Sequence, residues 1–308
     1  MDVLSDVLAA MRGGRPHAAR TLARAPWGVG FPPGDGAGCH VILRGSCWLM
    51  PTGGEPQALG VGDVVFLPRA TGYALADHPG SPVVDFRPGP GDGDAPLDQL
   101  RIDGAGATTT MLCAAYYFDR ERTHPLLGEL PDIVRLPSEV GRHTSLRATV
   151  ELLGRELATP QAGTSAILTS LVDMLLLFVL RAWLDEQATA PTTTGWAAIL
   201  NDPALSAALH AVHAHPERPW TVERLAALAG MSRATFAQRF AALAGRPPLA
   251  YLTWWRMTTA ARLLREGDAP LRVIAGQTGY TSEFAFAKAF RREYGQAPGQ
   301  YRRAAQRV

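Results

Sequence analysis

The chain has 308 residues, a formal net charge of +2 at pH 7 and three cysteines. With 47% hydrophobic and 19% charged residues, its composition indicates a globular protein. The chain is longer than an ordinary domain with a single hydrophobic core. We therefore expect two domains, each large enough to fold without disulfides or a bound metal. The chain is thus not a small fold that depends on either.

The N-terminal segment, residues 1–11, does not resemble an export signal. It mixes Asp2 and Asp6 with apolar residues, and it lacks a basic start and a long apolar core. We expect a cytoplasmic protein.

Residues 20–120 contain short apolar runs separated by glycine and proline. The clearest runs are His40-Val41-Ile42-Leu43, Cys47-Trp48-Leu49-Met50 and Val64-Val65-Phe66-Leu67. Apolar runs of this length, bounded by turn residues, are typical of β-strands. The region therefore predicts an all-β sandwich or barrel.

Two helices are predicted after the barrel, at residues 146–157 and 164–187, with Pro160 and Gly163 as breakers between them. The residues that follow have no hydrophobic periodicity, so we place an interdomain linker at 188–195.

The most apolar stretch of the chain, residues 166–184, is about long enough to span a bilayer. However, Asp173 lies inside it, Arg181 lies near its end, and its apolar residues recur at intervals of three and four. These features favour a helix buried against a partner, and we expect no membrane span.

The C-terminal part contains two copies of one short pattern, about fifty residues apart. In each copy a short apolar helix precedes a glycine turn, a serine that can cap a second helix, and two phenylalanines four residues apart. The copies are Leu225-Ala226 to Phe240, with Gly230 and Ser232, and Ile274-Ala275 to Phe290, with Gly279 and the cap pair Thr281-Ser282. The second turn is one residue longer than the first. One copy alone would fit any helical hairpin, but two matched copies predict a pair of helix-turn-helix motifs that read DNA.

Charge divides the chain in the same place. Residues 196–308 contain 15 lysine and arginine residues and seven aspartate and glutamate residues, a net charge of about +8, which leaves about −6 for residues 1–195. Arginine neutralises phosphate and supplies sequence-independent affinity, so DNA binding should weaken steeply as salt rises.

Several short motifs in the C-terminal part are typical of one protein family. They are Trp220-Thr221-Val222, Ala229-Gly230-Met231-Ser232, Gly279-Tyr280-Thr281-Ser282-Glu283, Ala289-Phe290-Arg291-Arg292, and Gly295-Gln296-Ala297-Pro298 with Tyr301-Arg302. In these motifs, residues 219–303 resemble the DNA-binding domain of the AraC/XylS family of bacterial transcription regulators. Between the motifs, residues 249–265 predict one helix whose aromatic side chains belong to the core and which would set the two readers about one duplex turn, roughly 34 Å, apart.

The N-terminal half resembles a second known domain. The stretch Gly62-Asp63-Val64-Val65-Phe66-Leu67-Pro68 is similar to the second block of the cupin barrel. With Arg24-Ala25-Pro26-Trp27-Gly28 and Leu43-Arg44-Gly45-Ser46-Cys47-Trp48, it resembles the cupin-type sensor domain of one AraC subgroup.

The two resemblances together imply an α+β two-domain protein. A cupin-like sensor and dimerisation domain would occupy residues 1–187, with its barrel at about 20–120 and its helices at about 142–187. An all-α DNA-binding domain, with two helix-turn-helix motifs joined by a long helix, would occupy residues 196–308. In this family such sensor-domain helices carry dimer contacts, so a homodimer is expected.

Catalytic cupins hold a metal with histidines and a carboxylate, and this chain matches that cluster only in part. His40 lies near the first block, but Tyr73 occupies the second-block position where metal-binding cupins have histidine. We expect no catalytic residue, no metal and no cofactor, and we assign ligand or redox sensing to His40, Cys47, Tyr73 and Cys113. The alternative is a metal-dependent cupin enzyme fused to a DNA-binding module.

The three cysteines, Cys39, Cys47 and Cys113, are odd in number, which argues against a disulfide framework and fits a reducing cytoplasm. They are either buried apolar residues or exposed thiols that sense an oxidant. Cys113 is the preferred sensor because it matches a cysteine often found in similar domains, and His124 or Arg120 could lower its pKa.

The outward face of each second helix should reach base edges in the major groove. The expected base-reading residues are Arg233, Ala234, Thr235, Ala237 and Gln238 in the first motif and, by the family pattern, Ser282, Glu283, Phe284, Ala287 and Lys288 in the second. Lys288, the only lysine in the chain, could contact guanine, and Gln238 could pair with adenine. The expected phosphate contacts are Arg246, Arg256, Arg291 and Arg292, although Arg256 could equally pair with an acid.

The sequence therefore predicts a sequence-specific DNA-binding transcription regulator that is controlled by a signal sensed in the barrel. Activation is the default because activators dominate the family, and an activator would also contact RNA polymerase. The expected partners are double-stranded DNA, a second copy of the chain, and a small-molecule effector or an oxidant.

Overall fold

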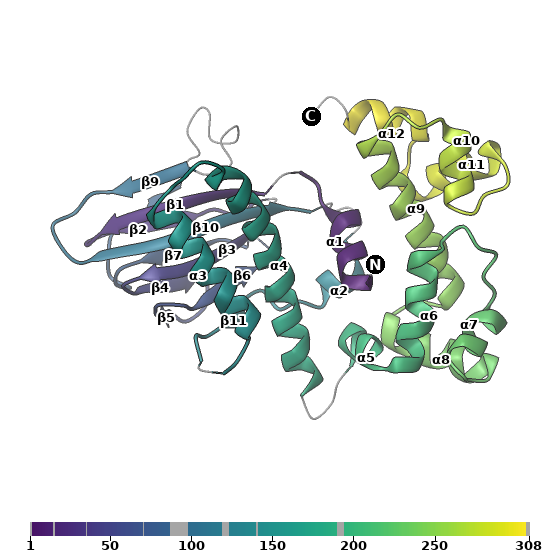
Figure 1. Ribbon diagram of the computed structural model, residues 1–308, viewed down its shortest axis with the longest axis horizontal. Helices are drawn as coiled ribbons and strands as arrows, with labels where there is room; N and C mark the ends of the chain where they lie inside the picture. Colours follow the sequence, from purple (N-terminus) through teal and green to yellow (C-terminus); the bar gives the residue numbers. More distant parts are fainter. Residues whose placement is uncertain are drawn as a thin grey trace. The chain divides into compact units, whose positions relative to one another are not determined.

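The computed structural model describes residues 2–14, 16–34, 36–69, 71–86, 98–118, 123–139, 141–189 and 194–305. The chain forms two compact units, a β-rich one and a helical one (Figure 1). The first, here called the β unit, contains residues 12–120 and 130–186. The second, here called the helical unit, contains residues 1–11, 121–129 and 187–308.

The β unit has two sheets in the described part of the chain. One sheet has the strand order β11-β6-β3-β10-β1-β9, and the other has the order β5-β4-β7-β2-β8. The strands are β1 His17–Arg24, β2 Gly28–Phe31, β3 Gly36–Arg44, β4 Cys47–Pro51, β5 Gln57–Leu59, β6 Val64–Leu67, β7 Tyr73–Ala76, β8 Val84–Asp85, β9 Asp98–Ile102, β10 Thr108–Tyr117 and β11 Val134–Leu136. The three apolar runs predicted as strands all lie in strands.

The core of the β unit lies between the two sheets. Ile42, Val65 and Met111 from the six-stranded sheet pack with Leu49 and Leu75 from the five-stranded sheet, and all five are buried. Side chains alternate along a strand, so the same strands present a second face to the outside of the sheet. The cupin-like barrel predicted from the sequence is thus confirmed as a two-sheet β fold.

Two long helices, α3 (Thr144–Ala158) and α4 (Thr164–Ala188), lie along the sheet surface of the β unit (Figure 1). The hydroxyl of Tyr116 on β10 donates to the carbonyl of Val172 on α4 at 2.7 Å. The side chains of Arg12 and Asp173 form an ion pair. By length and composition α4 could cross a membrane, and half of its most apolar window is buried in the structure.

The helical unit is built from ten helices in the described part of the chain. They are α1 Val3–Met11, α2 Pro125–Gly128, α5 Gly195–Asn201, α6 Pro203–Ala214, α7 Val222–Leu228, α8 Arg233–Ala244, α9 Pro248–Glu266, α10 Leu271–Gln277, α11 Glu283–Tyr294 and α12 Pro298–Ala305. The single long helix predicted between the two motifs is α9. Of the predicted linker 188–195, residues 190–193 lie outside the described residues.

The two units do not coincide with the predicted segments 1–187 and 196–308. Helix α1 and residues 123–129 belong to the helical unit, because their apolar side chains pack against the C-terminal helices. Val3, Val7 and Met11 lie four residues apart on one side of α1 and are buried. The guanidinium of Arg265 on α9 donates to the carbonyl of Ala10 at 2.8 Å.

A buried polar network lies beside this contact. The Tyr251 hydroxyl of α9 is 2.7 Å from Nε2 of His213 and 3.0 Å from Nε2 of His124. Asp6 of α1 lies 3.6 Å from the other ring nitrogen of His213. Burial lowers the pKa of both histidines, so both rings are neutral at pH 7 and one hydroxyl can bond to each. The network ties α1, α2 and α6 to the N-terminal part of α9.

Truncation of Met11 to alanine should lower the free energy of unfolding of the helical unit by about 2–5 kcal/mol, because it leaves a cavity between α1 and the C-terminal helices. Urea unfolding followed by tryptophan fluorescence measures this. The matched control is Leu228→Ala on α7, where the leucine is 48% exposed and the loss should not exceed about 0.5 kcal/mol. Equal losses in the two variants would contradict the assignment of α1 to this core.

Candidate nucleic-acid interface and sensor site

The first helix-turn-helix motif consists of α7 and α8. The two helices pack against each other, and Leu225 and Ala226 of α7 and Phe236 and Phe240 of α8 are all buried. Gly230 in the turn has a φ of +61°, a conformation that favours glycine. The Ser232 hydroxyl caps α8 by accepting the backbone N–H of Thr235 at 3.2 Å. These contacts fix one side of α8 and leave its other side outward.

The outward side of α8 carries the residues predicted to read bases. Arg233, Ala234, Thr235 and Gln238 are exposed, and Ala237 is half-buried. Nε of Arg233 lies 2.7 Å from a carboxylate oxygen of Glu223 on α7. Because both partners are largely exposed, this ion pair is weak and can be exchanged for a phosphate or a base.

The second motif, α10 and α11, repeats this construction with a turn one residue longer, as predicted. Its buried contacts are Ile274 and Ala275 of α10 with Phe286 and Phe290 of α11. The Ser282 hydroxyl caps α11 by accepting the backbone N–H of Ala285 at 3.1 Å. Gly279 has a φ of +79°, and a Cβ there would lie 2.6 Å from Nη2 of Arg256, so both conformation and space require glycine.

The predicted base-reading residues of the second motif also lie on the outward side. Ser282, Glu283, Phe284 and Lys288 are exposed, and Ala287 is half-buried. Phe284 is 81% exposed, an unusual position for a large apolar ring. Contacts of these side chains with bases stay a prediction.

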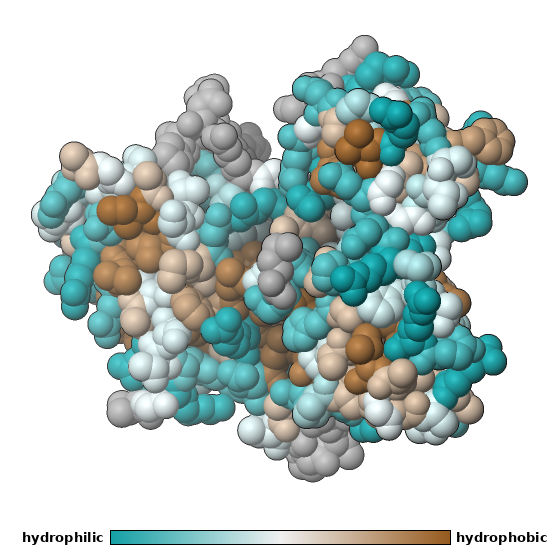
Figure 2. Space-filling model, turned by 45° about the vertical axis from the view of Figure 1, so that its right-hand side comes forward, coloured by the Kyte–Doolittle hydropathy of each residue, from teal (hydrophilic) through white to brown (hydrophobic). Residues whose placement is uncertain are grey.

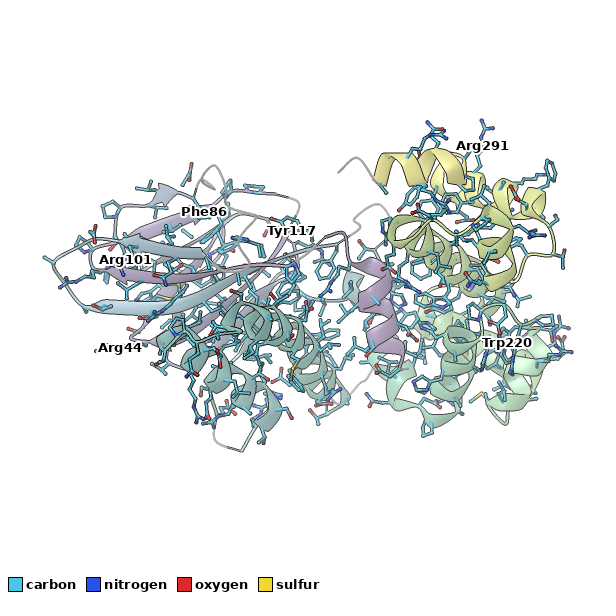
Figure 3. All side chains as sticks on the ribbon, turned by 45° about the horizontal axis from the view of Figure 1, so that its top comes forward. Arg44, Phe86, Arg101, Tyr117, Trp220 and Arg291 are labelled. Atoms are coloured by element: carbon cyan, nitrogen blue, oxygen red, sulfur yellow. The ribbon has the colours of Figure 1, made fainter. Side chains whose placement is uncertain are left out.

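The predicted phosphate contacts have different surroundings in the structure. Arg291 and Arg292 are exposed on the last turn of α11, and Figure 3 shows Arg291 projecting from the C-terminal helices. Arg246 follows α8 and lies over the ring of Trp254, 5.2 Å from its centroid. The face of the helical unit seen in Figure 2 is largely hydrophilic, with small hydrophobic patches.

The structure does not support a phosphate contact for Arg256. Its Nε donates to the carbonyl of Pro216 at 2.7 Å, and its Nη2 donates to the carbonyl of Arg218 at 2.8 Å. The side chain is half-buried, and burial lowers its pKa. Arg256 joins α9 to the loop before α7, instead of pairing with an acid or facing solvent.

The predicted sensor residues His40 and Tyr73 meet inside the β unit. Nε2 of His40 is 2.7 Å from the hydroxyl of Tyr73, and the Phe31 ring stacks on Tyr73 with centroids 4.8 Å apart. Burial lowers the pKa of His40 to about 4, so the ring is neutral at pH 7. A pocket of about 290 Å³ at the ends of β4, β6 and β7 reaches Tyr73.

The three cysteines are free, and their surroundings favour the protonated thiol. Burial raises the pKa of Cys47 to about 12 and that of Cys113 to about 11, and it raises the pKa of Cys39 further. The Thr21 hydroxyl lies 3.5 Å from Sγ of Cys113 and offsets part of this shift. His124, predicted as a group that could lower the pKa of Cys113, instead bonds to Tyr251 in the helical unit.

Arg120, the other group predicted to lower the pKa of Cys113, lies outside the described residues. Within the residues that the structure describes, no three histidine, cysteine, aspartate or glutamate side chains gather in a geometry that could hold a metal ion.

Comparison with known proteins gives two family matches. Residues 2–185 match the cupin family, and residues 225–304 match the helix-turn-helix domain family. Among solved structures, the DNA-binding domain of AdpA in complex with a target DNA is 39% identical, covering 34% of this chain and 93% of that chain with a TM-score of 0.32.

Several relatives match over nearly the whole chain, including the following two. A putative AraC-like transcription regulator of Streptomyces antibioticus is 33% identical and covers 98% of this chain and 99% of that protein. The RCS-specific HTH-type transcriptional activator RclR of Escherichia coli K12 is 29% identical and covers 93% of this chain and 87% of that protein. These relatives are transcription regulators, so the alternative of a cupin enzyme is not retained. The chain belongs to the AraC family of transcription regulators, with an N-terminal cupin domain and a C-terminal helix-turn-helix DNA-binding domain.

Proposed function

We propose that this regulator binds operator DNA as a homodimer, with α8 and α11 of each copy in the major groove, and that a signal received by the β unit changes this binding. The observation that carries the proposal is the pair of helices in which two phenylalanines four residues apart, Phe236 and Phe240 in α8 and Phe286 and Phe290 in α11, are buried while the opposite face is exposed. The assignment of sensing to residues 1–187 and of DNA binding to residues 196–308 is part of the same proposal.

The length of α9 supports simultaneous reading by both helices. This helix has 19 residues, which corresponds to about 28 Å at the rise of an α-helix. Successive major-groove faces on one side of a duplex are roughly 34 Å apart. A buried connecting helix of this length can hold two readers near that spacing.

The exposed residues of α8 and α11 suit different base contacts. Gln238 can bond in a bidentate way to adenine, and Lys288 can donate to the acceptors of guanine. Phe284, which is exposed and apolar, fits contact with a thymine methyl group. The alanine side chains of the first reader cannot form hydrogen bonds with bases. The shape of the DNA therefore contributes to the sequence selectivity of this reader.

The dimer is proposed to form through the helices of the β unit. Ile167 and Met174 are 43% and 40% exposed, and they lie seven residues apart on the same side of α4. Leu152 on α3 is also exposed. Exposed apolar side chains on a helix surface support burial against a second copy.

Activation of transcription is proposed by similarity, because RclR is named as an activator. Activation would bring the DNA-bound protein to RNA polymerase, in the cytoplasm. For the signal, thiols with raised pKa values, which stay protonated at pH 7, disfavour an oxidant. A small molecule that prefers one conformation of the β unit would shift DNA affinity.

Replacing Lys288 and Gln238 together with alanine should weaken operator binding by about ten- to a thousandfold, since each base contact contributes roughly 1–3 kcal/mol, while nonspecific binding changes little. Fluorescence anisotropy on the protein's own upstream DNA and on a scrambled duplex gives both affinities. An equal loss on the two duplexes would refute the base-reading role.

Replacing Arg291 and Arg292 with glutamine should instead weaken binding to both duplexes and reduce the slope of log affinity against log salt by about two, one for each phosphate contact. The control is Arg262→Gln, which removes an arginine that pairs with Glu266 on α9 and should leave the slope unchanged. An unchanged slope in the double variant would remove these residues from the phosphate contacts.

Cys113 should react slowly with iodoacetamide at pH 7, and its rate should keep rising beyond pH 10, because burial favours the neutral thiol and raises its pKa to about 11. Mass spectrometry of the labelled peptide across a pH series measures this rate. A rate that levels off below pH 8 would instead restore Cys113 as a redox sensor.

A further inference from the structure

A pocket of about 630 Å³ lies outside the sheet core of the β unit, between the six-stranded sheet and α3. Its floor includes Arg20 and Leu22 of β1, Thr110 of β10 and Arg44 of β3. Strand pairing brings them together, because Leu22 and Arg44 are both register partners of Thr110. The opposite wall is α3.

One face of α3 lines this wall. The lining residues are Arg147, Val150, Glu151, Gly154, Arg155 and Ala158, which recur at helical spacing. At Gly154 the helix lies close to β3, since a Cβ there would lie 3.7 Å from the side chain of Leu43, an ordinary van der Waals distance. The pocket is therefore built from two elements far apart in sequence.

The pocket concentrates positive charge. Four guanidinium groups line it, and Glu151 is its one lining carboxylate. Across the described residues, none of the four arginines forms an ion pair with a carboxylate. The cluster does not follow from a basic composition, since residues 1–195 are net acidic. Like charges repel in a partly desolvated groove, so an anion between them is stabilising.

The arginine donors are only partly used by the protein. Nη1 of Arg20 donates to the carbonyl of Leu157 at 3.0 Å, but its Nε is buried without a hydrogen-bond partner. Nη1 of Arg147 donates to the carbonyl of Glu139 at 3.1 Å. Arg44, which projects from the β unit in Figure 3, is exposed, as is Arg155. Planar guanidinium donors of this kind suit a carboxylate or phosphate oxygen.

The rest of the lining is apolar. Leu22, Leu43, Val61, Val150 and Leu157 contribute to it. Small-molecule sites combine such apolar walls with a few polar groups that orient the ligand. We propose that this pocket binds an organic anion, a carboxylate or phosphate carried on an apolar body, and that this anion is the signal to which the regulator responds. The role as the signal rests on the proposed function. A bound anion would join α3 to β1 and β3, because arginines of all three elements would contact it.

The test compares two dyes that share an apolar body and differ in charge. We would titrate the full-length protein with the anionic dye 8-anilinonaphthalene-1-sulfonate and with its neutral analogue N-phenyl-1-naphthylamine, and follow fluorescence. The variant Arg44→Gln/Arg155→Gln should bind the anionic dye at least about tenfold more weakly, the size expected for the loss of a charge-assisted hydrogen bond. Binding of the neutral dye should stay within about twofold.

Arg44 and Arg155 are suitable positions because neither side chain forms a bond that holds the described fold together, and circular dichroism checks this. The matched control, Arg181→Gln, removes an exposed arginine of α4 outside the pocket lining and should bind both dyes like the parent protein. Unchanged affinity of the double variant for the anionic dye would overturn the site, and so would equal loss of both dyes or loss in the Arg181 variant.

Operator binding, measured on the same proteins without dye, separates this inference from the proposed function. The double variant should keep the parent's operator affinity, and the anionic dye should change that affinity in the parent but not in the variant. Dye binding that leaves operator affinity unchanged in the parent would retain the site and overturn its role as the signal. Absence of operator binding by the parent would overturn the proposed function and leave the dye comparison valid.

Discussion

Burial of the surface of α9 is the constraint on which the helical unit depends. At its C-terminal end, Met257, Ala260 and Leu264 pack with Ile274, Phe286 and Phe290 of the second motif. At its N-terminal end, the Tyr251 ring contacts Phe240 of the first motif, with centroids 5.8 Å apart. Both helix-turn-helix motifs therefore pack against the same helix, and a change in the packing of α9 changes the positions of both motifs together.

The same helix explains why N-terminal residues belong to the DNA-binding unit. Besides the two motifs, α1 packs against α9, and His124 at the start of α2 bonds to Tyr251. Asp6, His124, His213 and Tyr251 form a polar network at this point, and neutral histidines suit it because a buried charge would be costly. Residues that flank the barrel in sequence thereby enter the core that orients the DNA readers.

Sequence patterns predicted the helix-turn-helix motifs well, because helical periodicity, glycine turns and serine caps are local signals. Gly230, Gly279, Ser232 and Ser282 all occupy the positions expected of them. The role of Arg256 could not be predicted, because its partners are backbone carbonyls about 40 residues away. Every residue has a backbone carbonyl, so the pattern of side chains does not show which carbonyl will accept a hydrogen bond.

The packing of the N-terminal half was less predictable, because it also depends on partners that are far apart in the sequence. The spacing of Val3, Val7 and Met11 indicates an amphipathic helix, yet no local signal shows that its partner lies beyond residue 196. The surroundings of Cys113 and the arginine pocket also depend on strand pairing over about 90 residues between β1 and β10. Arg147, Glu151 and Arg155 resemble an ordinary solvated helix face until Arg20 and Arg44 are brought opposite them.

If each copy of the protein reads DNA with two helices held by α9, hydroxyl-radical footprinting of the full-length protein on its own upstream DNA should detect both. We expect two protected backbone stretches for each copy, about one helical turn or roughly ten base pairs apart on the same face of the duplex. A single protected stretch for each copy would contradict this expectation.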